Sequence, residues 1–153
     1  CVCLYPEAEI RLVLEEELGR QSVGSTLISL RSVEQGTTAS AVLTSSGTMS
    51  LNCALAGIPG AIVYRAHPMT VWMGRRLVRV DWLGIANLVL GRELYPEYIQ
   101  EMARPAQLLK VLESALGDPA QREIFAAGAR DLDQHLRAEK SETVVRRLAA
   151  LVG

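Results

Sequence analysis

The chain has 153 residues, of which 49% are hydrophobic and 22% are charged, and its formal net charge is −1. This length suits one globular domain, and the balanced charge gives no field that would favour nucleic acid as a partner. No apolar run reaches the length of a membrane-spanning helix, and we expect no signal peptide. The chain has three cysteines, and their spacing matches no zinc motif. This odd number favours reduced thiols in a cytosolic protein.

The first part of the chain predicts a strand, a helix, a second strand and a short helix. Residues 2–4 form a short apolar run, and Pro6 then opens an acidic helix to about Gly19 with apolar residues at helical spacing. Residues 26–30 predict the second strand, and residues 32–39 predict the short helix.

A run of small and hydroxyl residues between two apolar strands is the most informative segment. Residues 41–44 and 61–64 predict the strands, and between them Ser45 or Ser46 is the expected N-cap of a helix that ends at Gly57. The glycine and hydroxyl residues at the start of this helix leave backbone N–H groups free and let a ligand approach closely. Such a helix start favours an anion, often a phosphate, so the run indicates recognition of a nucleotide diphosphate.

The middle of the chain continues with alternating patterns. A helix is predicted from Pro68 to about Val80, residues 83–86 are extended up to Asn87, and residues 92–101 predict a helix interrupted by Pro96. The rest is helical. One helix spans 105–117, a second is capped by Asp118 and reaches Leu136 or beyond, and a last one covers 142–152.

Short apolar strands that alternate with helices predict an α/β fold with a mostly parallel sheet covered on both faces. Ligands of such sheets bind at the carboxyl ends of the strands. Residues 44–48, residues 65–67 and Asn87 are all expected at such ends. Three polar clusters in one topological place strengthen the prediction of a ligand site there.

Several short motifs occur in order between about residues 40 and 102. They are Ser46-Gly47-Thr48 with Leu51, Ala56-Gly57-Ile58-Pro59, Val63-Tyr64-Arg65 with Pro68, Arg76-Leu77-Val78, Asn87-Leu88, Gly91-Arg92-Glu93-Leu94, Pro96-Glu97 and Gln100. In this order and at this spacing, the motifs resemble the lipid-A-disaccharide synthase family.

The resemblance implies the C-terminal, donor-nucleotide half of an inverting glycosyltransferase of the GT-B kind, with two Rossmann-like domains. Such an enzyme joins UDP-2,3-diacylglucosamine to 2,3-diacylglucosamine 1-phosphate and releases lipid A disaccharide 1-phosphate and UDP. The family's general base lies in the N-terminal domain. Residues 1–153 are therefore expected to be a Rossmann-like fragment with a helical tail over 103–153, which binds the donor but holds no catalytic residue. No metal or cofactor is implied.

The resemblance also assigns residues to the donor nucleotide. Ser46, Gly47 and Thr48 would contact the diphosphate. Asn52 would contact the ribose, at a position where the family usually carries a glutamate. An asparagine can still form hydrogen bonds with the ribose hydroxyls, but it lacks the negative charge of the glutamate. The remaining assigned residues are Arg65, Asn87, Glu93 and Gln100.

Each assigned residue has a plain structural alternative. Residues 46–48 can be only a cap and a turn, Asn52 a solvated helix residue, and Asn87 a turn former. Arg65 can meet phosphate or pair with a carboxylate such as Glu93. Glu93 can cap a helix, or share one face with Gln100 if residues 92–101 are helical.

The expected substrates are lipids, and one segment fits contact with a membrane. It combines bulky apolar and cationic side chains, as interfacial contact does, and the alternative, which fits each single residue somewhat better, is a packed helix with a solvated arginine face. These side chains are Trp72, Met73, Arg75, Arg76, Arg79 and Trp82. We expect a cytoplasmic protein peripheral to the inner membrane, with a homo-oligomer allowed. The alternative function is a non-catalytic nucleotide-binding or assembly module.

Overall fold

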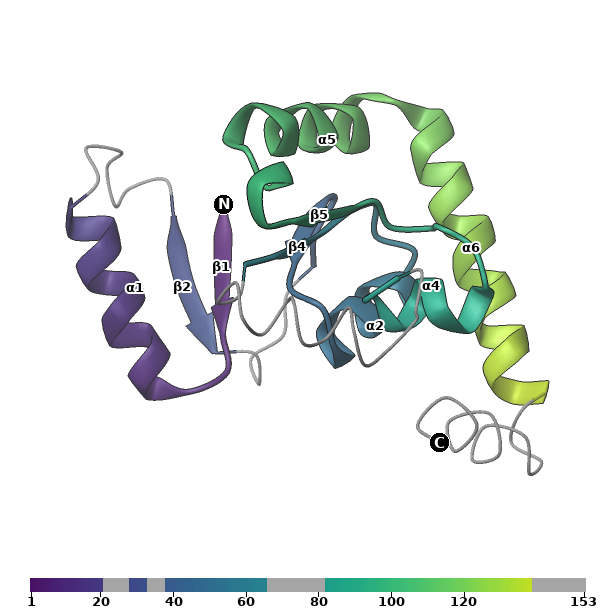
Figure 1. Ribbon diagram of the computed structural model, residues 1–153, viewed down its shortest axis with the longest axis horizontal. Coiled ribbons are helices and arrows are strands. Elements are labelled where there is room, and N and C mark those ends of the chain that lie inside the picture. The colour runs from purple at the N-terminus through teal and green to yellow at the C-terminus, as the bar shows by residue number, and fades with distance from the viewer. Residues whose placement is uncertain (21–27, 33–37, 66–81, 139–153) are drawn as a thin grey trace. The chain divides into compact units, whose positions relative to one another are not determined.

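The computed structural model describes four parts of the chain, residues 1–20, 28–32, 38–65 and 82–138 (Figure 1). The chain divides into two compact units, Cys1–Thr38 and Ala39–Gly153. The predicted helix from Pro68, with its tryptophan and arginines, and the last predicted helix over 142–152 lie outside the described residues. Most of the predicted helix over 32–39 also lies outside them.

The first unit is a strand, a helix and a parallel strand, as predicted. β1 (Val2–Tyr5) pairs with β2 (Ser29–Ser32), and α1 (Ala8–Arg20) connects them. Ser32 is the last residue of β2, so the prediction that it opens a helix is wrong. α1 buries none of its residues.

The second unit is built on a three-stranded parallel sheet. Its strands are β3 (Val42–Thr44), β4 (Gly60–Tyr64) and β5 (Glu97–Ile99), in the order β3-β4-β5. The short apolar runs around residues 42 and 61 therefore pair as parallel strands, which confirms the predicted α/β class. Because all three strands run the same way, their carboxyl ends share one edge of the sheet.

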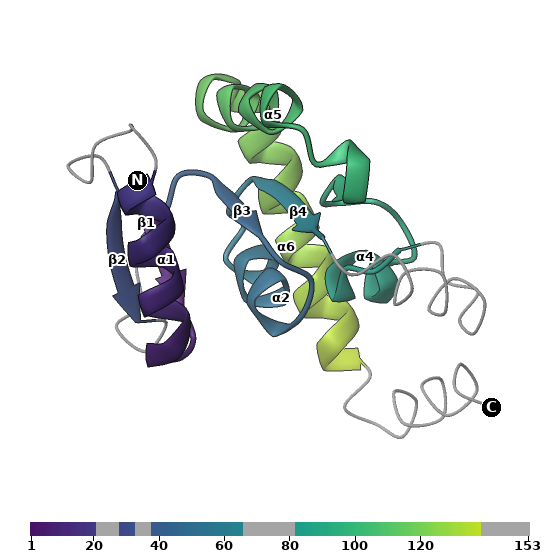
Figure 2. The same cartoon turned by 60° about the vertical axis from the view of Figure 1, so that its left-hand side comes forward.

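Helices cover both faces of this sheet, as Figures 1 and 2 show. α5 (Pro105–Gly117) lies on one side, and α2 (Thr48–Leu55) and α4 (Ile85–Leu90) lie on the other. α6 (Pro119–Ala138) packs against all three of these helices. No described helix is long and apolar enough to cross a membrane.

The core of the second unit centres on Tyr95, which is fully buried. Its ring meets the ring of Phe125 edge-on, with centroids 4.8 Å apart and planes at 78°. Its hydroxyl donates a hydrogen bond to the carbonyl of Ile58. Nearby, a Cβ on Gly128 would lie 2.5 Å from Leu94 Cδ1, so α6 approaches the loop before β5 closely.

Two predictions between residues 83 and 101 are wrong. Asn87 does not close an extended segment but lies inside α4, which ends at Gly91 in the left-handed region. Residues 92–101 do not form one helix. They form a loop, β5 and a 3-10 turn, η2 (Gln100–Met102). The physical reason is long-range, because the Asn87 amide binds the backbone of this loop and Ile62 N–H donates to the Pro96 carbonyl.

The two described helices of the tail begin where the local sequence predicts. α5 begins at Pro105 and ends at Gly117, as predicted. α6 begins at Pro119, and Asp118 Oδ1 accepts a hydrogen bond of 2.9 Å from Ala120 N–H. Proline at the first helical position and a capping aspartate need no distant partner, which is why the sequence alone located these helices.

Candidate functional site

The loop between β3 and α2 presents an open helix start. The N-cap is Gly47, at φ 122° and ψ −162°, a region that essentially only glycine adopts. The prediction that Ser45 or Ser46 caps the helix is therefore wrong, and α2 has no side-chain cap. Ser50 Oγ instead donates to the Gly47 carbonyl at 2.6 Å.

This helix start is suited to an anion. The first backbone N–H groups of a helix have no partner within the helix, and they carry the positive end of its dipole. A Cβ added at Gly47 would meet nothing within 4 Å, so the space beside the loop is open. Thr48 is exposed and Ser46 half-buried at this place, and Asn52 is exposed one turn further along α2.

Arg65 and Gln100 both leave the sheet at its carboxyl edge. Tyr64 and Ile99 form the last pair of the β4–β5 ladder, and Arg65 and Gln100 are the residues that directly follow these two strands. Arg65 is exposed and forms no ion pair with any described residue. Gln100 has a φ of 54°, a left-handed conformation that costs about 1–2 kcal/mol for a side chain other than glycine.

Asn87 lies in the interior, although the sequence predicted that it contacts a ligand. Its side chain is fully buried. Nδ2 donates to the Tyr95 carbonyl and to Glu97 Oε1, both at 2.8 Å, and Oδ1 accepts the N–H of Leu94 at 2.8 Å and of Tyr95 at 3.0 Å. These four bonds use both amide protons and both acceptor lone pairs, so none is left for a ligand.

Glu97 was not among the predicted site residues, although it lies in one of the motifs. Its carboxylate accepts the N–H of Leu83 at 2.8 Å and of Gly84 at 2.9 Å, besides the Asn87 amide. Gly84 is the N-cap of α4, so Glu97 supplies from β5 the cap that the helix lacks locally. The sequence signal that could have identified Glu97 was its place in the ordered motif series, where Pro96-Glu97 follows Asn87-Leu88.

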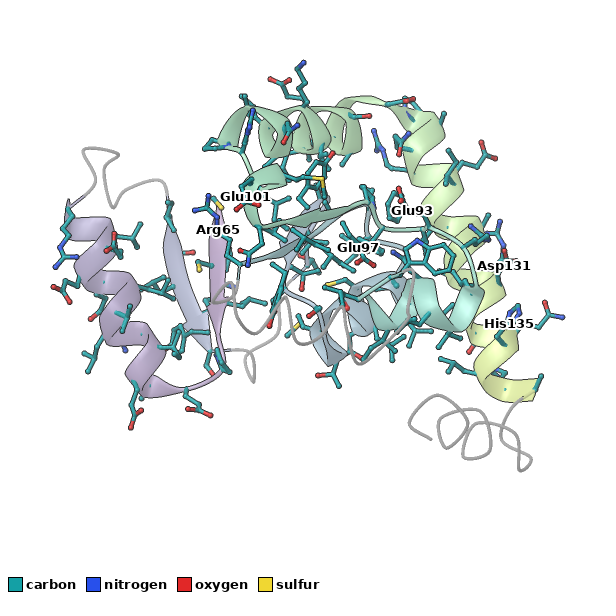
Figure 3. All side chains as sticks on the ribbon, viewed as in Figure 1. Arg65, Glu93, Glu97, Glu101, Asp131 and His135 are labelled. Carbon is teal, nitrogen blue, oxygen red and sulfur yellow. The ribbon has the colours of Figure 1, made fainter. Side chains whose placement is uncertain are left out.

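Glu93 lies away from the other assigned residues. It lines a hollow of about 320 Å³ together with Gly60 and Pro96, which lie at the amino ends of β4 and β5. Figure 3 accordingly shows Glu93 and Arg65 at opposite ends of the sheet. The alternative that Arg65 pairs with Glu93 is therefore wrong, and Glu93 does not share a helix face with Gln100.

Two described groups in the core have a raised pKa. Burial raises the pKa of the Cys53 thiol, and burial with the nearby Cys53 raises the pKa of the Tyr95 phenol. The carboxyl edge instead offers backbone donors, amide side chains and one guanidinium. These groups bind a phosphate group well, because they supply hydrogen bonds and positive charge together.

Comparison with known proteins assigns the chain to a family. A family model described as "Lipid-A-disaccharide synthetase" matches residues 5–150. The chain belongs to the lipid-A-disaccharide synthetase family. This membership confirms the resemblance inferred from the ordered motifs and extends it beyond residues 40–102.

Individual relatives agree with the family assignment. The "Lipid-A-disaccharide synthase" of Sodalis glossinidius (strain morsitans) is 41% identical over 114 residues, covering 74% of this chain and 30% of that protein. The synthase of Erwinia tasmaniensis is 37% identical over 102 residues, covering 67% of this chain and 27% of that protein. The synthase of Geobacter sulfurreducens is 42% identical over 88 residues, covering 58% and 23%. The matched part thus spans 30% or less of these relatives.

Proposed function

We propose that this chain is the donor-nucleotide part of a lipid-A-disaccharide synthase, and that the start of α2 binds the diphosphate of UDP-diacylglucosamine. The observation that carries the proposal is the conformation of Gly47, which leaves the first turn of α2 without a side-chain cap and open to a ligand. The names of the relatives support the reaction, since each is a lipid-A-disaccharide synthase.

The proposed reaction is a direct transfer. A hydroxyl of the acylated glucosamine phosphate acceptor attacks the anomeric carbon of the donor sugar, the bond from that carbon to the diphosphate oxygen breaks, and UDP departs. Negative charge then develops on the diphosphate. The N–H groups at the start of α2 and the Arg65 guanidinium stabilise that charge, because both lie at the carboxyl edge of the sheet.

The proposed contacts are narrower than the set assigned from the resemblance. Ser46, Gly47 and Thr48 contact the diphosphate, Asn52 contacts the ribose, and Arg65 and Gln100 line the same edge. We leave Asn87 and Glu93 out of the proposed contacts, because Asn87 is fully buried and Glu93 lines a separate hollow. We place no catalytic residue in residues 1–153, since the resemblance assigns the base that takes the acceptor proton to the N-terminal domain.

Both proposed substrates carry acyl chains. We therefore propose peripheral contact of the full-length protein with the cytoplasmic face of the inner membrane, where such substrates reside. The side chains that suggested this contact, except Trp82, lie outside the described residues. Homo-oligomerisation stays a prediction.

Calorimetric titration of the full-length protein with UDP and ADP tests the donor assignment. UDP should bind more tightly than ADP. Gly47→Ala should weaken UDP binding by about ten-fold or more, because alanine cannot hold φ 122° and the helix start must rearrange.

Gly91→Ala is the matched control. Gly91 also has a positive φ, 62°, and also has nothing within 4 Å of an added Cβ, but it ends α4 away from the proposed contacts. Its UDP affinity should remain at the wild-type value. UDP binding no tighter than ADP binding would refute the donor assignment, and equal losses in both glycine variants would refute the role of the α2 start.

One departure from the family favours a second candidate, a non-catalytic nucleotide-binding or assembly module. Asn52 is exposed beside the proposed site, where the family usually carries a glutamate. Disaccharide formation by the full-length protein decides between the two functions. Activity of the wild type would exclude the module, whereas an inactive wild type rescued by Asn52→Glu would mean that the departure is a functional loss.

A further inference from the structure

A polar network that is buried at Asn87 and half-buried at Glu97 joins α4 to the start of β5. Asn87 and Glu97 together take part in six hydrogen bonds, one of which joins the two side chains. The other five bind the backbone of two segments, residues 83–84 before α4 and residues 94–95 before β5. The network therefore holds the amino end of β5 against the amino end of α4.

The opposite end of β5 is the proposed donor edge. β5 has only three residues, which pair as Ile62 with Glu97, Val63 with Tyr98 and Tyr64 with Ile99. A ladder this short specifies its register weakly, and a slip of one residue would turn every side chain of the strand to the other face. Gln100 would then no longer lie level with Arg65.

The conformation of Gln100 also indicates that the end of β5 is held in place by its surroundings. Its left-handed φ of 54° is unfavourable for a side chain other than glycine, and such a residue persists only where the surrounding structure holds it. Gln100 follows β5 directly, so an anchored β5 is one part of that surrounding structure. The network around Glu97 supplies the anchor three residues earlier in the chain.

We propose that Glu97 and Asn87 are positioning residues of the donor site. They touch no ligand. They hold β5 in register with β4, and this register sets where Gln100 leaves the sheet relative to Arg65. The proposal rests on the proposed function for the identity of the ligand, UDP, whereas the effect on β5 can be measured without any ligand.

Glu97→Gln tests this role in the full-length protein. The substitution keeps the shape but replaces one acceptor oxygen by an NH₂ group, which then faces an N–H donor of Leu83, Gly84 or Asn87. Amide hydrogen exchange at residues 98–100 should become about ten-fold faster, while exchange in β3 should stay unchanged. UDP affinity should fall about ten-fold at a temperature where circular dichroism shows the variant folded.

Asp131→Asn is the matched control, because it makes the same change from carboxylate to amide. Asp131 forms an exposed ion pair of 2.7 Å with Arg92, in the same neighbourhood but outside the network. Its exchange rates at residues 98–100 and its UDP affinity should equal those of the wild type. A role confined to global stability would lower the urea midpoint of Glu97→Gln without changing the UDP affinity of the folded protein.

The outcomes separate this proposal from the proposed function. Unchanged exchange at residues 98–100 together with unchanged UDP affinity in folded Glu97→Gln would overturn the positioning role. Absence of UDP binding in the wild type would overturn the proposed function, and the exchange measurement would still decide the role of Glu97. If Glu97→Gln fails to fold, Glu97→Asp keeps the charge on a shorter side chain and should show a smaller change of the same sign.

Discussion

Tyr95 shows how a single side chain ties several elements of the core together. Its ring packs edge-on against Phe125 of α6, and its hydroxyl donates to the Ile58 carbonyl ahead of β4. Its backbone N–H and carbonyl both bind the Asn87 amide of α4. Burial raises the pKa of the phenol, because the phenolate would lose its hydration in this position.

Tyr95 should make the free energy of unfolding fall in alkaline solution. Its folded-state pKa lies above its unfolded value of about 10, so the unfolded chain loses the proton first as the pH rises. The stabilising contribution is complete below a pH of about 10 and is lost as the pH rises toward the folded pKa. Urea unfolding on both sides of that pH should show a steeper loss for the wild type than for Tyr95→Phe.

Equal slopes in the wild type and in Tyr95→Phe would contradict the assignment of the effect to Tyr95.

At the scale of elements, β3 and β4 approach each other too closely for a side chain at position 60. A Cβ on Gly60 would lie 1.8 Å from the carbonyl oxygen of Val42, an atom of the β3 backbone. Next to it, Val42 N–H donates to the Pro59 carbonyl at 2.9 Å. The pairing of these two strands, which brings the candidate loop and Arg65 to one edge, therefore requires glycine here.

Gly60→Ala should destabilise the protein by about 2–4 kcal/mol, because the clash is with backbone and no side chain can turn aside. Urea unfolding followed by circular dichroism measures the loss. Gly117→Ala, at the end of α5 with nothing within 4 Å, should change stability by less than about 0.5 kcal/mol. Similar losses in the two variants would show that the close approach of β3 and β4 does not limit stability.

At the scale of the whole molecule, the two units bury apolar surface very differently. Among the described residues, the fully buried hydrophobic side chains belong to the second unit, and they include Ile62, Tyr95 and Leu132. In the first unit α1 buries nothing, and Leu12 and Val13 are 67% and 57% exposed. The ion pairs along α1 are exposed and join residues three or four apart, so each adds little stability.

Amide hydrogen exchange of the 153-residue chain should therefore be faster in α1 than in the part of α6 between Phe125 and Leu132. Exchange from α1 needs only local opening, whereas exchange from α6 exposes the core, so the rates should differ by about a hundred-fold. Comparable protection of the two helices would contradict this ranking.

The sequence by itself determined the elements whose signals are local. Proline and aspartate at the start of α6, the apolar runs of β3 and β4, and the order of the motifs each need only neighbours along the chain. These signals led to the α/β class, to the helices α5 and α6 and to the family, and these three predictions are confirmed.

Only the tertiary structure decided the conformation of residues 83–101. There the hydrogen bonds of Asn87 and Glu97 join residues seven to fourteen positions apart, and they override a local pattern that favoured one helix. The same bonds make Asn87 a buried group that binds the backbone. The sheet puts Arg65 and Gln100 after the carboxyl ends of β4 and β5, whereas Glu93 lies near their amino ends. A sequence pattern records which residue types recur and at what spacing. It does not record which distant backbone group satisfies a buried amide or carboxylate.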